Sequence, residues 1–226
     1  MARSVIVTGG FGVLGAAVAA AFAAAGDKVT RIDFAPEARE ALAGALDIGG
    51  VDLTDAQATQ AALDKVVAAH GGIDVLVNVA GGFTWETLEG GSLASWARMQ
   101  AMNLTTAATI TQLALPRLKA SAAGRVVNIG AGAAIKAGAG MGAYAASKSG
   151  VHRLTEALAE ELAGTGVTIN AVLPSVIDTP ANRADMPDAD FSTWVQPRAI
   201  ADVIAFLASD AARAITGALI PVTRGG

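Results

Sequence analysis

Short β-branched apolar runs alternate with longer stretches rich in Ala and Leu along almost the whole chain. Several runs are apolar throughout, whereas a strand with one face in water would alternate apolar and polar residues. Strands covered on both faces are typical of a parallel sheet with helices on each side. The pattern therefore predicts an α/β fold with a doubly wound parallel sheet of the Rossmann type. The runs predicted as strands are Val5–Val7, Val29–Ile32, Ile73–Val77, Val126–Ile129, Val167–Leu173 and Leu219–Val222.

The sequence contains no Pro- or Ser-rich stretch that would separate two domains, so we expect residues 1–226 to form a single domain. Of these residues 53% are hydrophobic and 16% are charged, a balance that excludes a disordered chain. The formal charge of -4, with no block of Lys or Arg, argues against nucleic acid or an anionic membrane as a partner. Two isolated histidines and no cysteine predict that no metal site is present.

Helix starts are predicted at two places. Residues Thr54–Gln57 have the spacing of a capping box, and Ser92 can cap a long helix that runs toward Pro116. The Ala-rich run that follows Arg3 is interrupted by glycines and is too short for a spanning helix, which argues against a secretion signal. We therefore expect a cytoplasmic protein.

The first predicted strand leads directly into a glycine-rich loop. Gly10, Gly12 and Gly15 form the pattern G-x-G-x-x-G, which an Ala-rich helical stretch follows. Such glycines allow a tight turn and let backbone amides approach a pyrophosphate at the helix N-terminus. The loop predicts a dinucleotide site. The residues expected to contact the dinucleotide here are Gly9, Phe11, Gly12, Val13, Leu14 and Gly15.

Asp33 ends the second predicted strand, 18 positions after Gly15. A carboxylate at this place accepts hydrogen bonds from the adenosine ribose hydroxyls and repels a 2′-phosphate, which favours NAD(H). Arg31 is expected on the same side as Asp33, so some tolerance of NADP(H) stays open. Asp52, after a third strand, either holds the adenine edge or supports a helix cap at Thr54.

These residues resemble the short-chain dehydrogenase/reductase family when they are taken together with Asn103, Tyr144 and Lys148. The resemblance also includes Asn78–Gly81 and spans nearly the whole chain. It implies an oxidoreductase with a nicotinamide dinucleotide cofactor and a small-molecule substrate, commonly assembled as a homodimer or homotetramer. Further cofactor contacts implied by the resemblance are Asp52, Leu53, Asn78, Ala80, Gly81, Lys148, Pro174, Ile177 and Thr179.

Tyr144 and Lys148 are four residues apart, so on a helix they share one face. A positive charge beside a phenol favours the phenolate, and we expect it to lower the pKa of Tyr144 toward neutral pH. The resemblance implies that Tyr144 is the general acid/base and that Lys148 also binds the nicotinamide ribose. It implies that Asn103 supports a proton relay through water.

One position departs from the family pattern. The family's catalytic serine lies 13 positions before the tyrosine, and Ala131 stands there. The chain has no Ser or Thr between Asn128 and Tyr144. Loss of a donor to a developing oxyanion reduces the rate by roughly 10²–10³-fold. Reduction of an ordinary ketone is therefore expected to be slow.

The family's dihydropteridine reductases share the alanine, and their substrate-side loop resembles Asp178–Trp194. A quinonoid dihydropteridine is electron-poor and conjugated, so hydride delivery does not concentrate charge on one carbonyl oxygen. We therefore expect a flat conjugated substrate of this kind. The residues expected at the substrate are Phe83, Ala131, Tyr144 and Asn182, with Trp85 and Trp194 as further walls. Ordinary packing for the aromatic residues and a loop-forming role for Asn182 and Arg183 are equally open.

Two other functions stay open. A carbonyl reductase or alcohol dehydrogenase could have the serine's function carried out by water or another donor. A non-catalytic NAD-binding sensor is disfavoured because the Tyr144/Lys148 pair is intact.

Overall fold

The computed structural model describes residues 2–224, within which seven strands form one parallel sheet. The strand order is β3-β2-β1-β4-β5-β6-β7, and every neighbouring pair is parallel. This confirms the predicted doubly wound α/β fold. The strands are β1 (Ser4–Thr8), β2 (Lys28–Ile32), β3 (Leu46–Ile48), β4 (Val75–Asn78), β5 (Arg125–Ile129), β6 (Thr168–Pro174) and β7 (Leu219–Val222).

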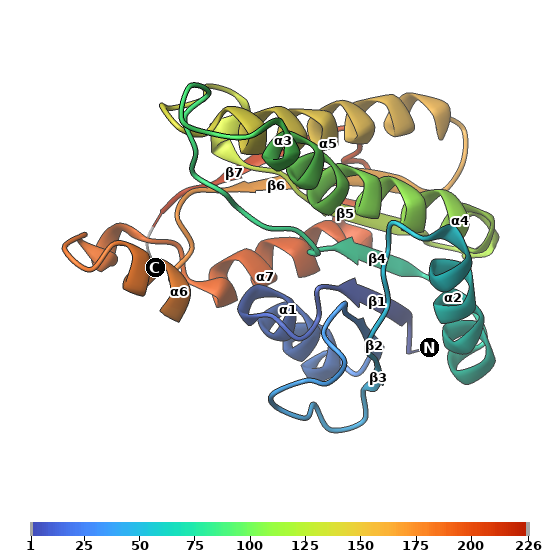
Figure 1. The fold of residues 1–226 in the computed structure, drawn as a ribbon. Coiled ribbons are helices and arrows are strands. Elements are labelled where there is room, and N and C mark those ends of the chain that lie inside the picture. Colours follow the sequence, from blue (N-terminus) through green and yellow to red (C-terminus); the bar gives the residue numbers. More distant parts are fainter. Residues whose placement is uncertain (1, 225–226) are drawn as a thin grey trace.

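Helices cover both faces of the sheet (Figure 1). One face packs against α2, α4 and α5, and the other packs against α1 and α7. The helices are α1 (Val13–Ala24), α2 (Ala56–His70), α3 (Leu93–Gln100), α4 (Thr106–Ala120), α5 (Gly142–Glu161), α6 (Pro180–Asp185) and α7 (Pro197–Leu207). A π-helical turn at Ala101–Thr105 joins α3 to α4.

The apolar character of the strands follows from this layering. In β1, Val5 and Val7 lie in the core beneath α1 and α7, whereas Ile6 between them lies in the core beneath α2 and α4. Successive side chains of a strand point to opposite faces, so two apolar layers require apolar residues at every position. The sheet therefore has two cores, one on each face.

Local signals set the ends of the helices, with two corrections to the sequence analysis. Ser92 caps α3 as predicted and accepts a hydrogen bond from the Ala94 amide at 3.1 Å. The cap of α2 is Asp55 and not Thr54, because the Asp55 carboxylate accepts from two first-turn amides. Pro116 lies inside α4, which continues to Ala120.

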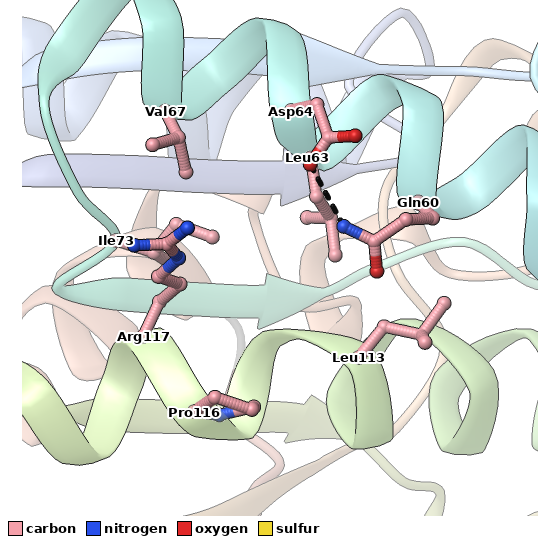
Figure 2. Close-up of a pocket in the computed structure, with 8 residues that line it drawn as sticks. All are labelled: Gln60, Leu63, Asp64, Val67, Ile73, Leu113, Pro116 and Arg117. Atoms are coloured by element: carbon pink, nitrogen blue, oxygen red, sulfur yellow. Dashed lines mark hydrogen bonds between the residues drawn. The ribbon is translucent and has the colours of Figure 1, made fainter.

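A hollow of about 220 Å³ lies between α2 and α4 (Figure 2). Figure 2 shows Gln60 donating to Asp64 along α2, with a distance of 2.8 Å. The hollow is lined by Gln60, Leu63, Asp64, Val67, Ile73, Leu113, Pro116 and Arg117. None of these is a predicted site residue, so the hollow is separate from the candidate active site.

The loops that follow β1, β4, β5 and β6 lie at the carboxyl edge of the sheet. Strand order reverses between β1 and β4, and ligands of open α/β sheets bind at such a reversal. The fold therefore brings the predicted site loops to one edge of the sheet.

Within residues 2–224, none of the helices combines the length and the apolar character that a membrane span requires.

Candidate active site

Three glycines of the glycine-rich loop lie where a side chain would not fit. Gly9 has a φ of +60°, and a Cβ there would lie 2.9 Å from the Ala80 backbone. A Cβ on Gly15 would collide with the carbonyl oxygen of Gly9. A Cβ on Gly10 would lie 2.6 Å from the Cβ of Arg31. Glycine at these positions lets the loop approach Arg31 of β2 and the Ala80 backbone after β4 closely.

The start of α1 fits the pyrophosphate of a dinucleotide. Gly12 is the N-cap, and within residues 2–224 no side chain caps the helix. The first turn also has no acidic residue. Uncapped amides and the helix dipole together favour a bound anion. The predicted contacts at Phe11–Gly15 therefore have suitable surroundings, and their binding role stays a prediction.

Asp33 joins the end of β2 to this loop. One carboxylate oxygen accepts from the Phe11 amide at 2.9 Å, and the other accepts from the Ala35 amide at 2.9 Å. The carboxylate is half-buried, so it can still face a ribose. The bond to Phe11 gives Asp33 a second function, in shaping the glycine loop, which the sequence analysis did not foresee.

Arg31 does not extend toward the cofactor edge as a free cation. Its guanidinium donates to both carboxylate oxygens of Asp47, at 2.7 and 2.6 Å, and to the Glu40 carbonyl. The side chain is buried beneath Gly10, and its guanidinium carbon lies 5.3 Å from the centroid of the Phe11 ring. Arg31 is therefore already paired with a carboxylate in this geometry, and the expected tolerance of NADP(H) stays a prediction.

The side chains of Asp52 and Leu53, both predicted cofactor contacts, lie in different surroundings. Asp52 is exposed and accepts from the amide and hydroxyl of Thr54, and these bonds lower the pKa of its carboxyl. Leu53 is buried in the core against α2. Of the two alternatives for Asp52, the structure shows the bonds to Thr54, while a contact with adenine stays a prediction.

Two polar groups fix the ends of β1 and β4. The Thr8 hydroxyl accepts from the amides of Val79 and Ala80, both at 3.0 Å, and so fixes the loop after β4. The Asn78 amide group donates to Thr111 at 2.9 Å and to Asn128 at 2.8 Å. The Asn78 side chain thus braces β4 against α4 and β5, and its contact with the cofactor stays a prediction.

Lys148 is buried in the wall of the site. Its ammonium donates to the Ile129 carbonyl at 2.7 Å, at the end of β5, and lies near Gly81. Burial lowers the pKa of Lys148 to about 8, because desolvation penalises the charged form. The Lys148 side chain is therefore fixed at the cofactor edge by one hydrogen bond.

Tyr144 lies one turn before Lys148 on α5, as predicted. The Phe83 ring contacts it edge to face, with centroids 5.0 Å apart. Burial raises the pKa of Tyr144 to about 12, so the expected lowering by Lys148 is wrong for the chain by itself. The physical reason is desolvation of the phenolate, and the Lys148 ammonium is bonded to the Ile129 carbonyl.

Asn103 lies in the π-helical turn and is buried. Its side chain exchanges two hydrogen bonds with the Gly82 backbone, at 2.9 and 3.1 Å, and donates to the Ser147 hydroxyl at 3.0 Å. Asn103 therefore fixes the loop that carries Phe83. Its predicted role in a proton relay is not tested by these contacts. Ser147, which the sequence analysis did not single out, completes this cluster.

Two serine hydroxyls on α5, which follows Ala131 in the chain, are already engaged. Ser149 donates to the Ala134 carbonyl at 2.9 Å, and Ser147 donates to the Tyr144 carbonyl at 2.7 Å. His152 accepts from the Ala131 amide at 3.3 Å, and burial lowers the pKa of its ring. His152 therefore fixes the backbone at Ala131, and the two serine hydroxyls are directed to backbone carbonyls.

The loop after β6 is held by side chains. Asp178 pairs with Arg183 through two bonds, at 2.6 and 2.8 Å, and accepts from Gln196. These bonds lower the pKa of Asp178 to about 2. Thr179 caps α6 and Asn182 donates to the Ile177 carbonyl at 2.8 Å. The contacts of Asn182 and Arg183 agree with a loop-forming role for both.

The aromatic residues divide into two groups. Phe83 and Trp85 are 52% and 61% exposed, and a Cβ on Gly140 would collide with the Trp85 ring. Trp194 is only 6% exposed and packs on Phe191, so its surroundings are those of a packing residue. Within the described part of the chain, no group of three His, Cys, Asp or Glu side chains could hold a metal ion.

Comparison with known proteins agrees with this geometry. The family model described as short chain dehydrogenase matches residues 3–190. D-threitol dehydrogenase from Mycolicibacterium smegmatis is 36% identical, over 97% of this chain and 91% of that protein.

Solved structures give the same result. Aldohexose dehydrogenase from Thermoplasma acidophilum has a TM-score of 0.90 and 29% identity, over 99% of this chain and 93% of that one. An NAD⁺-bound xylitol dehydrogenase has a TM-score of 0.88 and 25% identity, over 99% and 98% of the two chains. The chain therefore belongs to the short-chain dehydrogenase/reductase family and is an NAD(P)-dependent oxidoreductase.

Proposed function

We propose that this protein is an NADH-dependent reductase of a flat conjugated acceptor, with quinonoid dihydropteridine as the first candidate substrate. The observation that carries the proposal is the environment of Ala131, where an oxyanion donor would be needed for a ketone. The hydroxyls of Ser147 and Ser149 on α5 donate to backbone carbonyls. An acceptor that spreads its charge through a ring needs no such donor.

The preference for NADH rests on charge. The Asp33 carboxylate is fixed by two amides at the end of β2, and Asp47 neutralises the Arg31 guanidinium. A 2′-phosphate at this end of the site would meet a carboxylate without a free cation from Arg31 to offset the repulsion. We therefore propose NADH over NADPH.

Tyr144 is suited to the proton transfer that reduction requires. With a pKa of about 12, the phenol carries its proton at neutral pH and can donate it to a substrate. Bound NADH would supply the hydride. Lys148 keeps a positive charge next to this face of α5 below its pKa of about 8. Phe83 contacts the Tyr144 ring and provides an apolar wall for a flat substrate.

A second candidate is the oxidation of a polyol or another secondary alcohol. It is favoured by the relatives, which are named dehydrogenases of D-threitol, aldohexose and xylitol. The two candidates use the Tyr144 proton in opposite directions, because alcohol oxidation requires the phenolate as a base and reduction requires the phenol as an acid. Turnover measured in each direction therefore distinguishes them.

The test is steady-state turnover at pH 7 with NADH and quinonoid dihydropteridine, beside NAD⁺ with D-threitol, xylitol and aldohexoses. We expect fast turnover of the pterin and slow turnover of the alcohols. The reverse result would replace the first candidate with the second. Binding of NADH without any turnover would indicate a sensor.

Tyr144→Phe tests the proton donor in the same assay. The variant keeps the ring that packs on Phe83 and removes only the hydroxyl. We expect kcat to fall by about 10²–10⁴-fold, the scale of general acid catalysis, with the Kd for NADH unchanged. Full activity in Tyr144→Phe would exclude the phenol as the donor.

A further inference from the structure

A second hollow, of about 420 Å³, lies at the amino edge of the sheet, opposite the candidate active site. It is bordered by Arg125 and Thr168, which begin β5 and β6, and by the segment Gly164–Val167 that follows α5. Arg213 and Asp210, beyond α7, border it from the other side. Neither the sequence motifs nor the proposed reaction uses this part of the molecule.

Arg125 brings an incompletely paired charge to this hollow. Its Nη1 donates to the carbonyls of Gly124 and Gly166, at 2.8 and 3.2 Å. Its Nε has no hydrogen-bond partner among residues 2–224. Its Nη2 lies 3.6 Å from an Asp210 oxygen, beyond ordinary hydrogen-bond distance. The Arg125 side chain is 4% exposed, whereas that of Asp210 is 90% exposed.

Burial of this charge is unfavourable without a close partner. Desolvation lowers the pKa of Arg125, and nearby Arg3 adds to the effect, while Asp210 opposes it. A buried guanidinium is stabilised when its donors reach a carboxylate or phosphate at short distance. Carbonyl groups and a distant, solvated carboxylate satisfy only part of this requirement.

The rest of the hollow supplies one further charged donor, Arg213. Arg213 is exposed, and its guanidinium donates only to the Asp210 backbone carbonyl, at 3.2 Å, among the bonds that residues 2–224 form. Two guanidinium groups and one carboxylate leave a net positive charge on the lining.

We propose that this hollow binds a small oxyanion of the phosphate or carboxylate class, seated between the Arg125 and Arg213 guanidinium groups. The Asp210 carboxylate competes with the anion for Arg125. The site is independent of the cofactor loop, which lies at the other edge of the sheet.

The competing roles of Arg213 and Asp210 predict effects of opposite sign. Arg213→Gln removes one exposed cation and is expected to weaken anion binding about fivefold, the scale of one partly exposed charge contact. Asp210→Asn removes the competitor and is expected to tighten binding by about the same factor. Arg198→Gln is the matched control, because Arg198 is exposed on α7 and pairs only with Asp202 among the described residues.

The experiment is a titration of the full chain with inorganic phosphate, followed by amide chemical shifts in ¹⁵N–¹H spectra. Acetate is a second arm for the carboxylate class, and chloride at equal ionic strength is the reference. We expect saturable shifts at Gly164, Gly166 and Thr168 with phosphate or acetate. The variants should change the Kd in the stated directions, with spectra that are otherwise those of the folded wild type.

Three results would overturn the proposal. The first is a set of non-saturable shifts equal to those with chloride. The second is a response confined to the cofactor loop at Gly12–Gly15. The third is an Asp210→Asn variant with unchanged or weaker binding, which would mean that Asp210 does not compete for Arg125.

Discussion

The loops that follow β1 and β6 lie at the same edge of the sheet, yet they are held in different ways. Backbone contacts that exclude any Cβ fix the loop after β1, as at Gly9 and Gly15. Side-chain bonds hold the loop after β6, mainly those that Arg183 and Gln196 donate to Asp178. In this ion pair the Arg183 side chain is 50% exposed and the Asp178 side chain is 8% exposed. A partly exposed ion pair tolerates change more readily than a backbone collision does.

This difference explains why the cofactor class can be read more easily than the substrate. A loop whose backbone contacts require glycine at particular positions, such as Gly9 and Gly15, leaves a sequence pattern that few other structures require. The side chains predicted at the substrate include the exposed apolar residues Phe83 and Trp85, which many substrates could contact. Substrate specificity depends on side-chain positions that no short pattern records.

The largest expected effect comes from adding a methyl group to Gly15, in the loop after β1, and comparing it with the same change at Gly132, in the loop after β5. In Gly15→Ala the new Cβ meets the Gly9 carbonyl, so the cofactor loop must shift. We expect the Kd for NADH to rise about 100-fold, equivalent to about 2.7 kcal/mol and within the range for overpacking. Gly132→Ala is the control, because its nearest atom, the Pro174 carbonyl oxygen, lies 3.9 Å away. Calorimetric Kd values that change equally in both variants would contradict the comparison.

The next largest expected effect is on the free energy of unfolding, and it comes from the buried Lys148. Its pKa of about 8 in the folded chain lies below 10.5, so the unfolded chain binds more protons between these values and stability rises with pH there. Below pH 8 the burial of the charge is fully unfavourable, by about 3 kcal/mol. Lys148→Met removes this unfavourable free energy of burial. It also removes the hydrogen bond to the Ile129 carbonyl, which contributes about 1 kcal/mol.

We therefore expect Lys148→Met to be more stable than the wild type at pH 7, by about 2 kcal/mol, although it loses activity. The gap should narrow as the pH rises from 8 toward 10.5. Urea unfolding at pH 7 and at pH 9.5 measures both values. A variant that is less stable at pH 7 would show that the buried ammonium is better stabilised than its surroundings indicate.

A smaller effect is expected at Asp33, on the cofactor side. Asp33→Asn removes the charge but keeps an oxygen that can accept from the Phe11 amide. We expect the ratio of the NADPH and NADH dissociation constants to fall about tenfold, or about 1.4 kcal/mol. Asp33→Ala should also weaken NADH itself, because the Phe11 amide loses its acceptor. Equal binding of both cofactors by the wild type would refute the role of Asp33.

Much of the fold was predictable because each strand is buried on both faces and therefore apolar. Contacts between distant residues were not predictable, since no local pattern encodes them. The Arg31–Asp47 pair and the Asn78–Asn128 bond are examples. Strand β3 (Leu46–Ile48) has only three residues, and its sequence contains no clear apolar run.

The candidate site shows the same division. The spacing of Tyr144 and Lys148 predicted their shared helix face. It could not predict the direction of the Tyr144 pKa, which depends on burial beside Phe83 and on the bond that Lys148 forms with the Ile129 carbonyl. Asp55 replaced Thr54 as the cap because both residue types accept hydrogen bonds and only the backbone path decides between them.

The most direct test of the proposed function is the effect of Ala131→Ser on kcat/KM for two substrates, with NADH as the donor. For quinonoid dihydropteridine we predict no gain, because no single oxygen develops the charge that a hydroxyl would stabilise. For a simple ketone we predict a low wild-type value and a gain toward about 10²-fold, the scale of one oxyanion donor. Fast reduction of ketones by the wild type, with no turnover of the pterin, would contradict the proposal.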